Sequence, residues 1–539
     1  MDLRSIFPQS PLRYTISNHH LARTKFPFQF QSCLRQSLLP PAASIPRIVR
    51  IGTSSLTPRT RVRKCSADDQ NTKPEEIHTR AEIASLQVET KFDFPSLWSQ
   101  MKQIVIFCGP AIGMWICSPL MSLIDTIVIG KTSTMELAAL GPGTAISDYL
   151  GFLFMFLGIS TSSMIATSLA KKDKDLTQHQ ISILMFIALI CGAGLFLLTK
   201  FFGRSMLTGF VGLKNSHLIP AADSYIQIRS LAFPAFLVSM ICQSSSLGMK
   251  NSWGPMKALT VATAVNCIGD IILCSFFGFG IAGAAWATMA SQIVAAFMMI
   301  QTLNKAGFNA FSLHVPSSAE LFQIIKLAAP VFLITTSKVF FYSMLTYCTT
   351  AMGTITIASH QVIINLFLIC SLLGNPLLQS AQAFMPEMIC GIDRSLEKAR
   401  MLFKSLTIIG FFGGLISGTV ATLVVLFFPN IFTNDNLIVQ KMHKVIFPLF
   451  MALVITPSTL AFEGILLSGR ELGFLSLSMT GCFSLGVLLL MFICNRGGDL
   501  TGCWCVLAGF QWARFLLSLV RLTSSKGMLY TEKVTRINM

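Results

Sequence analysis

From about residue 101 onward, the chain consists of long apolar runs separated by short polar segments. A helix needs about 20 residues to cross the hydrocarbon core of a bilayer, and each run reaches that length. Loops on the side of the N-terminus carry more Lys and Arg than loops on the other side, which predicts that both termini lie on the inner face. The pattern predicts twelve membrane-spanning helices at about 104–128, 140–166, 180–202, 222–247, 257–279, 282–303, 322–349, 357–386, 402–428, 440–467, 472–494 and 501–521.

The apolar runs repeat at an offset of about 220 residues. Gly109-Pro110 matches Ala329-Pro330, and each pair opens an apolar run. We therefore expect an all-α polytopic membrane protein with two six-helix lobes related by a parallel repeat, at 101–310 and 311–522, and a C-terminal tail at 523–539. Parallel repeats are typical of transporters whose substrate site lies between the halves near mid-membrane.

The composition excludes an ordinary soluble enzyme. Hydrophobic residues make up 53% of the 539 residues and charged residues only 12%, whereas an average soluble domain is about one quarter charged. The formal net charge of +17 does not indicate a nucleic-acid partner, because much of it comes from residues 1–65. That segment holds eleven basic residues and one acid, Asp2, and no nucleic-acid-binding motif accompanies them.

Residues 1–65 are predicted to be a targeting segment. They are rich in Ser, Arg and Pro and lack the apolar core of a secretory signal peptide. The absence of a clear Arg-rich amphipathic helix favours a plastid transit peptide, read by the plastid import machinery, over a mitochondrial one. A basic tail that stays attached is the alternative. Residues 66–100 are polar and slightly acidic, and we expect a disordered linker there.

The sequence offers no metal or cofactor site. Its fifteen cysteines scatter through apolar segments without a CxxC pair or a His-Cys cluster, so we interpret them as buried thiols that act as small hydrophobic side chains. P-loop, GxSxG and HExxH motifs are also missing from the sequence. These absences argue against an ATP-driven pump and against a membrane-embedded enzyme.

Two acids inside apolar runs are candidates for function, because a charge in the bilayer interior is costly. Asp125 lies deep in the first run, and Asp270 lies in the fifth, four residues after Asn266. The i,i+4 spacing places Asn266 and Asp270 on one helical face. Carboxyl groups in a low-dielectric cavity favour the neutral form and could hold a proton at neutral pH. A structural role, with hydrogen bonds from helix to helix, is the alternative.

In the second half, Lys338 lies midway along an apolar run, with Tyr342 about one turn later. A buried ammonium would attract an organic anion, and the phenol ring could stack on an aromatic acid. Pairing with an acid such as Glu463, or snorkelling to the interface, is an equal alternative. Glu463 corresponds to Gln243 in the repeat and is a second-half candidate for coupling or pairing. Arg514 lies near a helix end and is expected at the interface.

Several segments resemble a known transporter family. Gly109-Pro110, Asp125-Thr126-Ile127-Val128-Ile129-Gly130 and Glu136-Leu137-Ala138-Ala139 resemble the first-helix signature of multidrug and toxic compound extrusion (MATE) transporters. The turn at 247–255 is similar to a degraded form of the family's loop between spans four and five. The resemblance covers about 101–522. It is closest to the DinF-type branch and, through segments such as 280–288, to plant chloroplast-envelope members that export salicylate in defence.

This resemblance implies a cation-coupling site. DinF-type members with such a site place an acid in span one and an Asn-x-x-x-Asp pair in span five, and they add a polar amide in span four and a Thr in span six. The matching residues for H+ or Na+ are Asp125, Gln243, Asn266, Asp270 and Thr288. Pro110 removes a backbone hydrogen bond within span one, so that helix can bend. In related transporters such a bend is proposed to couple protonation to substrate release; a static kink is the alternative.

Taken together, the sequence predicts a cation-coupled antiporter, driven by a transmembrane proton or sodium gradient without a further cofactor. The resemblance implies that it exports a small aromatic carboxylate such as salicylic acid from the chloroplast to the cytosol. The expected location is the chloroplast envelope, with both termini in the stroma. The alternatives are a flippase of lipid-linked substrates from the same superfamily, or a MATE exporter of an unrelated metabolite or of an organic cation.

Overall fold

A computed structural model describes residues 94–392, 394–433, 435–525 and 527–530. The leader predicted at 1–65 lies outside these residues, as does the predicted linker up to residue 93. The predicted disorder is wrong for the last part of that linker, because residues 94–100 belong to the first long helix. Leu97 is buried there although the segment is polar overall, so one apolar contact extends the helix outward.

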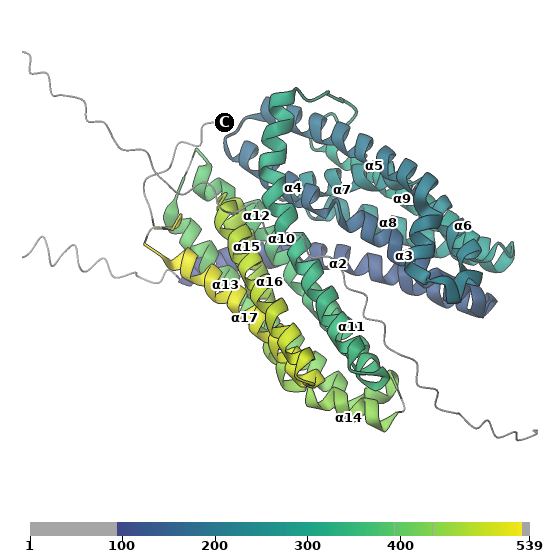
Figure 1. Cartoon of the computed structure of the whole chain (residues 1–539). Coiled ribbons are helices and arrows are strands. Elements are labelled where there is room, and N and C mark those ends of the chain that lie inside the picture. The colour runs from purple at the N-terminus through teal and green to yellow at the C-terminus, as the bar shows by residue number, and fades with distance from the viewer. Residues whose placement is uncertain (1–93, 393, 434, 526, 531–539) are drawn as a thin grey trace, which may run out of the picture. The chain divides into compact units, whose positions relative to one another are not determined.

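All regular elements of the described residues are helical (Figure 1). A short π-helix, Ile271–Phe276, follows α8 directly, and a few 3₁₀ turns join other helices. The helices of the first half are α2 (Phe94–Thr132), α3 (Thr134–Phe152), α4 (Met155–Ala170), α5 (Lys174–Val211), α6 (Ile219–Ser230), α7 (Phe233–Gly248), α8 (Trp253–Asp270) and α9 (Gly280–Lys305). Those of the second half are α10 (Ser318–Ala351), α11 (Thr354–Ser371), α12 (Asn375–Cys390), α13 (Leu396–Phe427), α14 (Asn436–Lys444), α15 (Ile446–Ser468), α16 (Leu472–Asn495) and α17 (Leu500–Thr523).

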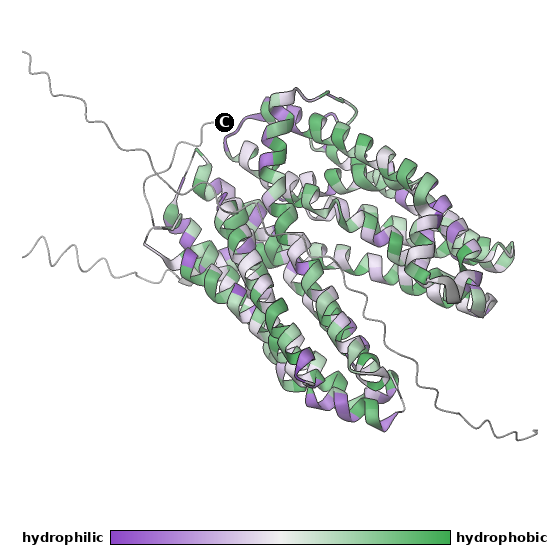
Figure 2. Cartoon of the chain, in the orientation of Figure 1, coloured by the Kyte–Doolittle hydropathy of each residue, from purple (hydrophilic) through white to green (hydrophobic). Residues whose placement is uncertain are grey.

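These helices account for the predicted spans. Within the described part of the chain, 11 segments are long and apolar enough to cross a membrane, and the number becomes 12 if α6 and α7, which are bent by 52°, form one broken span. Large apolar side chains cover the outside of the long helices; Phe201 and Phe276 are 75% and 82% exposed. In Figure 2 the long helices are mostly hydrophobic along their length, and hydrophilic residues gather mostly toward helix ends. Such a surface matches lipid and would aggregate in water.

The two halves repeat each other in structure at the predicted offset. Adding 220 to the bounds of α4, 155 and 170, gives 375 and 390, the bounds of α12. The same addition takes the first residue of α3 to that of α11, and that of α9 to that of α17. The parallel repeat is therefore confirmed, and it sets up residue pairs 220 apart that occupy equivalent places in the two lobes.

Each lobe has its own apolar core, and α2 joins the two. Ile104 and Cys108, near the start of α2, belong to the core of the second lobe, whereas Ile129, near its end, belongs to the core of the first. Cys108 Sγ lies 3.2 Å from Ser380 Oγ of α12. The helix continues through Pro110 and Pro119, so its two ends contact different lobes without a break in between.

In the second lobe, α15 is buried along most of its length and packs closely on α13. Three glycines of α13 at four-residue spacing, Gly410, Gly414 and Gly418, face α15. A Cβ at Gly414 would clash with the carbonyl oxygen of Val454, and one at Gly410 would lie 2.8 Å from Ser458 Oγ. Small residues at this spacing let two membrane helices approach closely.

We expect Gly414→Ala to destabilise the protein by about 1–3 kcal/mol, because the added methyl must push α13 away from α15. Gly413→Ala is the matched control, since nothing lies within 4 Å of a Cβ at that position. The measurement is the thermal unfolding midpoint of the purified full chain in detergent. Equal midpoints for the two variants would show that the close approach does not limit stability.

Candidate functional site

Four of the predicted coupling residues meet inside the first lobe. Asp125 comes from α2, Asn266 and Asp270 come from α8, and Thr288 comes from α9; all four are buried. Asn266 Nδ2 donates to Asp125 Oδ1 at 3.4 Å and lies 3.3 Å from Thr288 Oγ1. We call this group the carboxyl cluster. It links three helices through polar groups in an otherwise apolar core.

Asp270 is the unusual member of the carboxyl cluster. No N–H or O–H donor of the described residues reaches either of its carboxyl oxygens. Asp270 lies one helical turn after Asn266, whose amide donates to Asp125, so both acids belong to the same buried site. Two carboxylates buried in one site repel each other, and a proton on one of them would remove that repulsion.

No ion pair among the described residues involves either acid. The guanidinium of Arg229, in the same lobe, is engaged elsewhere. Arg229 pairs with Asp148 at 2.8 Å and lies 3.3 Å from the Tyr225 hydroxyl. Negative charge on these two acids is thus not balanced by an ion pair within the described part of the chain.

Local backbone features hold the cluster in place. Asp270 ends α8, and the π-helix begins at the next residue; such wide turns often occur at functional sites. On the other side, α9 begins at Gly280 with φ +54°, where a Cβ would clash with the Glu136 carboxylate. Glu136 Oε2 accepts from the Ile281 N–H at 3.0 Å and so caps α9. This cap fixes the helix that carries Thr288.

Gln243 does not join the cluster, which corrects the prediction of five residues in one site. Its Nε2 lies 3.9 Å from Met114 Sδ. Met114 precedes Asp125 by eleven residues on α2, about three helical turns. Gln243 therefore contacts the same helix at a different depth. The family spacing matched this residue, but the contact between helices places it elsewhere.

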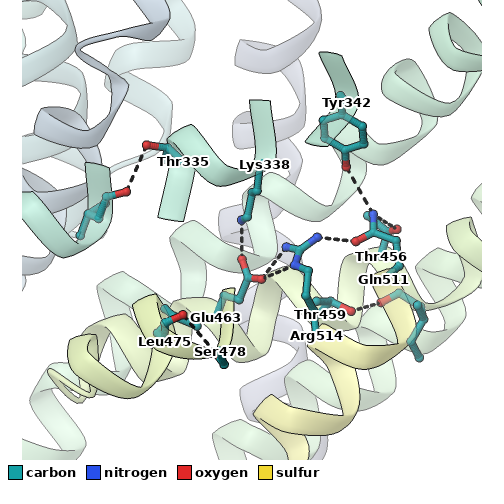
Figure 3. A network of polar contacts seen from close by, with 12 residues as sticks. Thr335, Lys338, Tyr342, Thr456, Thr459, Glu463, Leu475, Ser478, Gln511 and Arg514 are labelled. Carbon is teal, nitrogen blue, oxygen red and sulfur yellow. Dashed lines mark hydrogen bonds and ion pairs between the residues drawn. The ribbon is translucent and has the colours of Figure 1, made fainter. Parts of the chain in front are cut away.

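The second lobe contains an ion-pair network around Glu463, drawn in Figure 3. Lys338 Nζ of α10 lies 2.6 Å from Glu463 Oε2 of α15. Arg514 of α17 reaches the other oxygen, Glu463 Oε1, with Nε at 3.0 Å and also with a terminal nitrogen. We call Lys338, Glu463 and Arg514 the cation triad. The interpretations left open for Lys338 were binding of an organic anion, pairing with Glu463 and snorkelling to the interface; the structure shows the pairing, and the side chain stays 20% exposed.

Arg514 was expected at the interface, and that prediction is wrong. Its side chain is only 4% exposed because α17 turns it inward against Glu463. It also donates to the Gln511 side-chain oxygen, and Gln511 Nε2 lies 3.2 Å from Thr456 Oγ1 and 3.5 Å from the Tyr342 hydroxyl. Gln511 and Arg514 are three residues apart, which places both on one helical face. This spacing was the sequence signal for a buried polar network on that helix.

The triad carries two cations and one carboxylate, which leaves one positive charge without a partner in the described residues. Aromatic rings lie beside it. The rings of Phe341 and Phe510 stack at 4.0 Å, and the Arg514 guanidinium lies 5.2 Å from the Phe510 ring. Positive charge next to ring faces suits an anion that carries an aromatic ring.

The repeat shows that each lobe has chemistry that the other lacks. The positions 220 residues after Asp125 and Asp270 are Leu345 and Leu490, both buried. The positions 220 residues before Lys338 and Arg514 are Ser118 and Val294. Asp125 and Asp270 thus belong to the first lobe, and the triad with its excess positive charge belongs to the second. No group of three or more His, Cys, Asp or Glu side chains in the described segments could hold a metal ion.

Comparisons with known proteins agree with this architecture. The family model described as MatE matches residues 110–272. Protein DETOXIFICATION 47, chloroplastic, of Arabidopsis thaliana is 55% identical over 437 residues, 81% of this chain and 80% of the relative. Protein DETOXIFICATION 44, chloroplastic, of the same plant is 24% identical and covers 79% of this chain and 82% of its own length.

Solved structures show the same fold. A Vibrio cholerae MATE transporter superposes with a TM-score of 0.68 at 16% identity, covering 81% of this chain and 100% of that one. A MOP-superfamily transporter from Pyrococcus furiosus, described as having a binding pocket of reverse polarity, gives a TM-score of 0.67 at 19% identity, with 78% and 94% covered. At these identities the likeness concerns the fold.

We expect Glu463→Gln to destabilise the protein by about 3–5 kcal/mol, because it leaves the buried Arg514 and the partly buried Lys338 without their counter-ion. Lys338→Gln should have a much smaller effect, because Arg514 and Glu463 then remain as a balanced pair. The measurement is the unfolding midpoint of both variants in detergent. A larger loss for Lys338→Gln would contradict the charge count on which the triad is based.

Proposed function

Because the chain belongs to the multidrug and toxic compound extrusion (MATE) family of efflux transporters, we propose that it uses a proton gradient to export a small aromatic carboxylate from the plastid. Members of this family are transporters, so the chain is not an enzyme. One observation carries the proposal. A carboxyl pair without a cation lies in the first lobe, and a triad with an uncompensated positive charge lies in the second.

The carboxyl cluster is the proposed coupling site. One proton between Asp125 and Asp270 removes their repulsion, and loss of that proton restores it. Asn266 donates to both Asp125 and Thr288, so Thr288 helps to hold the amide that orients the Asp125 carboxyl. Sodium at the same oxygens is the second candidate, supported by three acceptor oxygens without a donor among the described residues: both of Asp270 and Oδ1 of Asn266.

Helix α2 is the proposed link between coupling and transport. It carries Asp125 in the core of the first lobe, and its opposite end packs in the core of the second. Pro110 lies between these two ends and removes one backbone hydrogen bond. A change of charge at Asp125 can therefore alter the helix that holds the two lobes together. In this proposal Pro110 is the point where α2 bends.

The triad is the proposed substrate site. A carboxylate that joins Lys338, Glu463 and Arg514 balances two positive charges with two negative ones. Tyr342 lies within reach of the same network through Gln511, and its ring can contact an aromatic substrate. Salicylate fits this chemistry. It is ionised at stromal pH, and a charged carboxylate crosses a bilayer poorly, so its export needs a carrier.

The proposed location is the chloroplast envelope, with both termini in the stroma. The Arabidopsis relatives DETOXIFICATION 47 and 44 are both named chloroplastic. The basic leader at 1–65 supports import into the plastid, and the excess of Lys and Arg in the loops beside the N-terminus supports the orientation. The triad disfavours the alternative of an exporter of organic cations, because the excess positive charge of the triad would repel such a substrate.

For the coupling site, we expect Asp270→Asn to abolish uptake driven by a pH gradient in sodium-free proteoliposomes, because the amide cannot release a proton. Exchange of labelled for unlabelled substrate without a gradient should persist. Asp175→Asn is the control, since this exposed acid lies at the start of α5 in the same lobe and outside the cluster. Gradient-driven uptake at the unmodified rate in both Asp125→Asn and Asp270→Asn would refute proton coupling at this site.

For the substrate site, we expect Lys338→Ala to raise the KM for salicylate about ten- to a hundredfold, because it removes the excess positive charge and a charged hydrogen bond. Lys338→Arg should keep most of the affinity. The measurement is salicylate uptake in proteoliposomes beside uptake of a labelled organic cation. Transport of the cation and not of the carboxylate would overturn the substrate while leaving an efflux transporter.

A further inference from the structure

The first helix of each half starts in the core of the opposite lobe. Ile104, near the start of α2, belongs to the core of the second lobe. Its equivalent 220 residues later, Ile324 near the start of α10, belongs to the core of the first lobe. The starts of α2 and α10 are therefore both held by the opposite lobe, on the side of the N-terminus, and each also makes polar contacts there.

These two polar contacts differ in charge. Near the start of α2, the Gln100 amide donates to the Lys398 carbonyl oxygen of α13 at 3.5 Å and accepts from Ser405 Oγ at 3.5 Å. The position equivalent to Gln100 on α10 is Glu320. Glu320 Oε1 lies 2.6 Å from His179 Nε2 of α5, the helix that corresponds to α13. A neutral contact in one lobe is thus a carboxylate–imidazole pair in the other.

The segment that joins the lobes packs against the same end of α5. The ring of His314, from this segment, meets the His179 ring edge-on with the centroids 5.0 Å apart. Gln178 exchanges two hydrogen bonds with the backbone of Asn309 in the segment, at 2.9 and 2.8 Å. The start of α5 therefore holds both the joining segment and the start of α10.

The His179–Glu320 pair lies where it can exchange protons with water. The two side chains are 39% and 34% exposed. The titratable groups that face His179 from other elements are Glu320 of α10 and His314 of the joining segment. Asp173 caps α5. The other charged side chains near the ends of α4 and α9 and near the starts of α5 and α10 are exposed: Lys171, Lys172, Lys174, Asp175, Lys305 and Lys326.

We propose that the His179–Glu320 pair is a pH-sensitive latch that holds the start of α10 against the first lobe when His179 is protonated. Histidine gains or loses its proton between about pH 5 and pH 8. With the proton, the contact is a charge-assisted hydrogen bond between imidazolium and carboxylate, and without it the bond has about half that strength. Protonation and the latched arrangement therefore favour each other, so the latch weakens as the pH on this side rises.

The latch connects the pH on the N-terminal side with the second lobe. Lys338 of the triad lies on α10, about five helical turns after Glu320. Pro330 lies between them and removes one backbone hydrogen bond, so the start of α10 can move relative to the part that carries Lys338. An exposed ion pair contributes little free energy, and we therefore expect the latch to shift the docking equilibrium of α10 about two- to fivefold.

The test is hydrogen exchange of the purified full chain in detergent at about pH 5 and about pH 8, with labelling times scaled so that the intrinsic exchange of the amides is equal. Peptides from the start of α10 and from the joining segment at 306–317 report on the latch. Peptides around Gln100, at the neutral contact, are the internal control. We expect the α10 peptides to exchange about two- to fivefold faster at the higher pH, and the α2 peptides to stay unchanged.

Substitutions separate the charge from the hydrogen bond. His179→Gln keeps a donor for Glu320 but cannot be protonated, so exchange should be fast at both pH values. His179→Lys stays charged and should exchange slowly at both. Glu320→Gln should match His179→Gln, and its amide oxygen can still complete the capping box with Ser317. His314→Phe keeps a ring beside His179 and should retain the pH dependence.

A pH response of α10 that persists in His179→Gln would overturn the latch. So would a response that disappears in His314→Phe, because the titrating group would then be His314. An equal response at the start of α2 would show a general effect of pH on the fold and would also contradict the proposal. The measurement uses neither substrate nor gradient, so its result is independent of the proposed transport of aromatic carboxylates.

Discussion

The free energy of burying charge in an apolar interior is the constraint on which the rest of this structure depends. Each buried ion costs several kcal/mol unless a partner or a proton neutralises it. Arg229, whose side chain is 15% exposed, pairs one-to-one with the half-exposed Asp148. Two other groups are not balanced among the described residues: Asp125 and Asp270 form no ion pair, and the triad around Glu463 has one cation in excess. The proposed exchange of a proton for a carboxylate would balance both groups.

Helix α2 connects the two lobes that carry these charges. Most helices pack within one lobe, but α2 starts in the core of the second lobe and ends in the core of the first. Asp125 is placed near its far end, where a change of charge acts on a helix already anchored in the opposite lobe. The ring of Phe107, near the start of α2, meets that of Phe384 of α12 edge-on at 5.7 Å. Phe384 also lies 5.0 Å from the ammonium of Lys250, which pairs with Glu387 of α12, so one side chain contacts both α2 and this ion pair between the lobes.

The sequence was sufficient to predict whatever depends on local pattern. Apolar length predicted the spans, the offset of 220 predicted the repeat, and the i,i+4 spacing placed Asn266 and Asp270 on one face. It was insufficient where the direction of a side chain depends on packing between helices. Gln243 matched a family spacing but meets Met114, about three turns from Asp125. Arg514 lies nine residues before the end of α17 and looked interfacial, because its partner, Glu463, is on another helix 51 residues away.

Asp125 and Asp270 lie in the first lobe, and the triad with its excess positive charge lies in the second. The same electrostatics explains this separation. Opposite charges about 4 Å apart attract by about 4 kcal/mol at an effective dielectric of 20. Glu463 shows the result, since each of its oxygens is occupied by a cation. An acid pair placed beside Lys338 and Arg514 would be held ionised by them, and it could neither take up a proton nor leave a charge for the substrate. Leucines at the positions equivalent to Asp125 and Asp270 keep such acids out of the second lobe. In the proposed exchange, the duplicated scaffold can hold both groups because its two copies have diverged in charge.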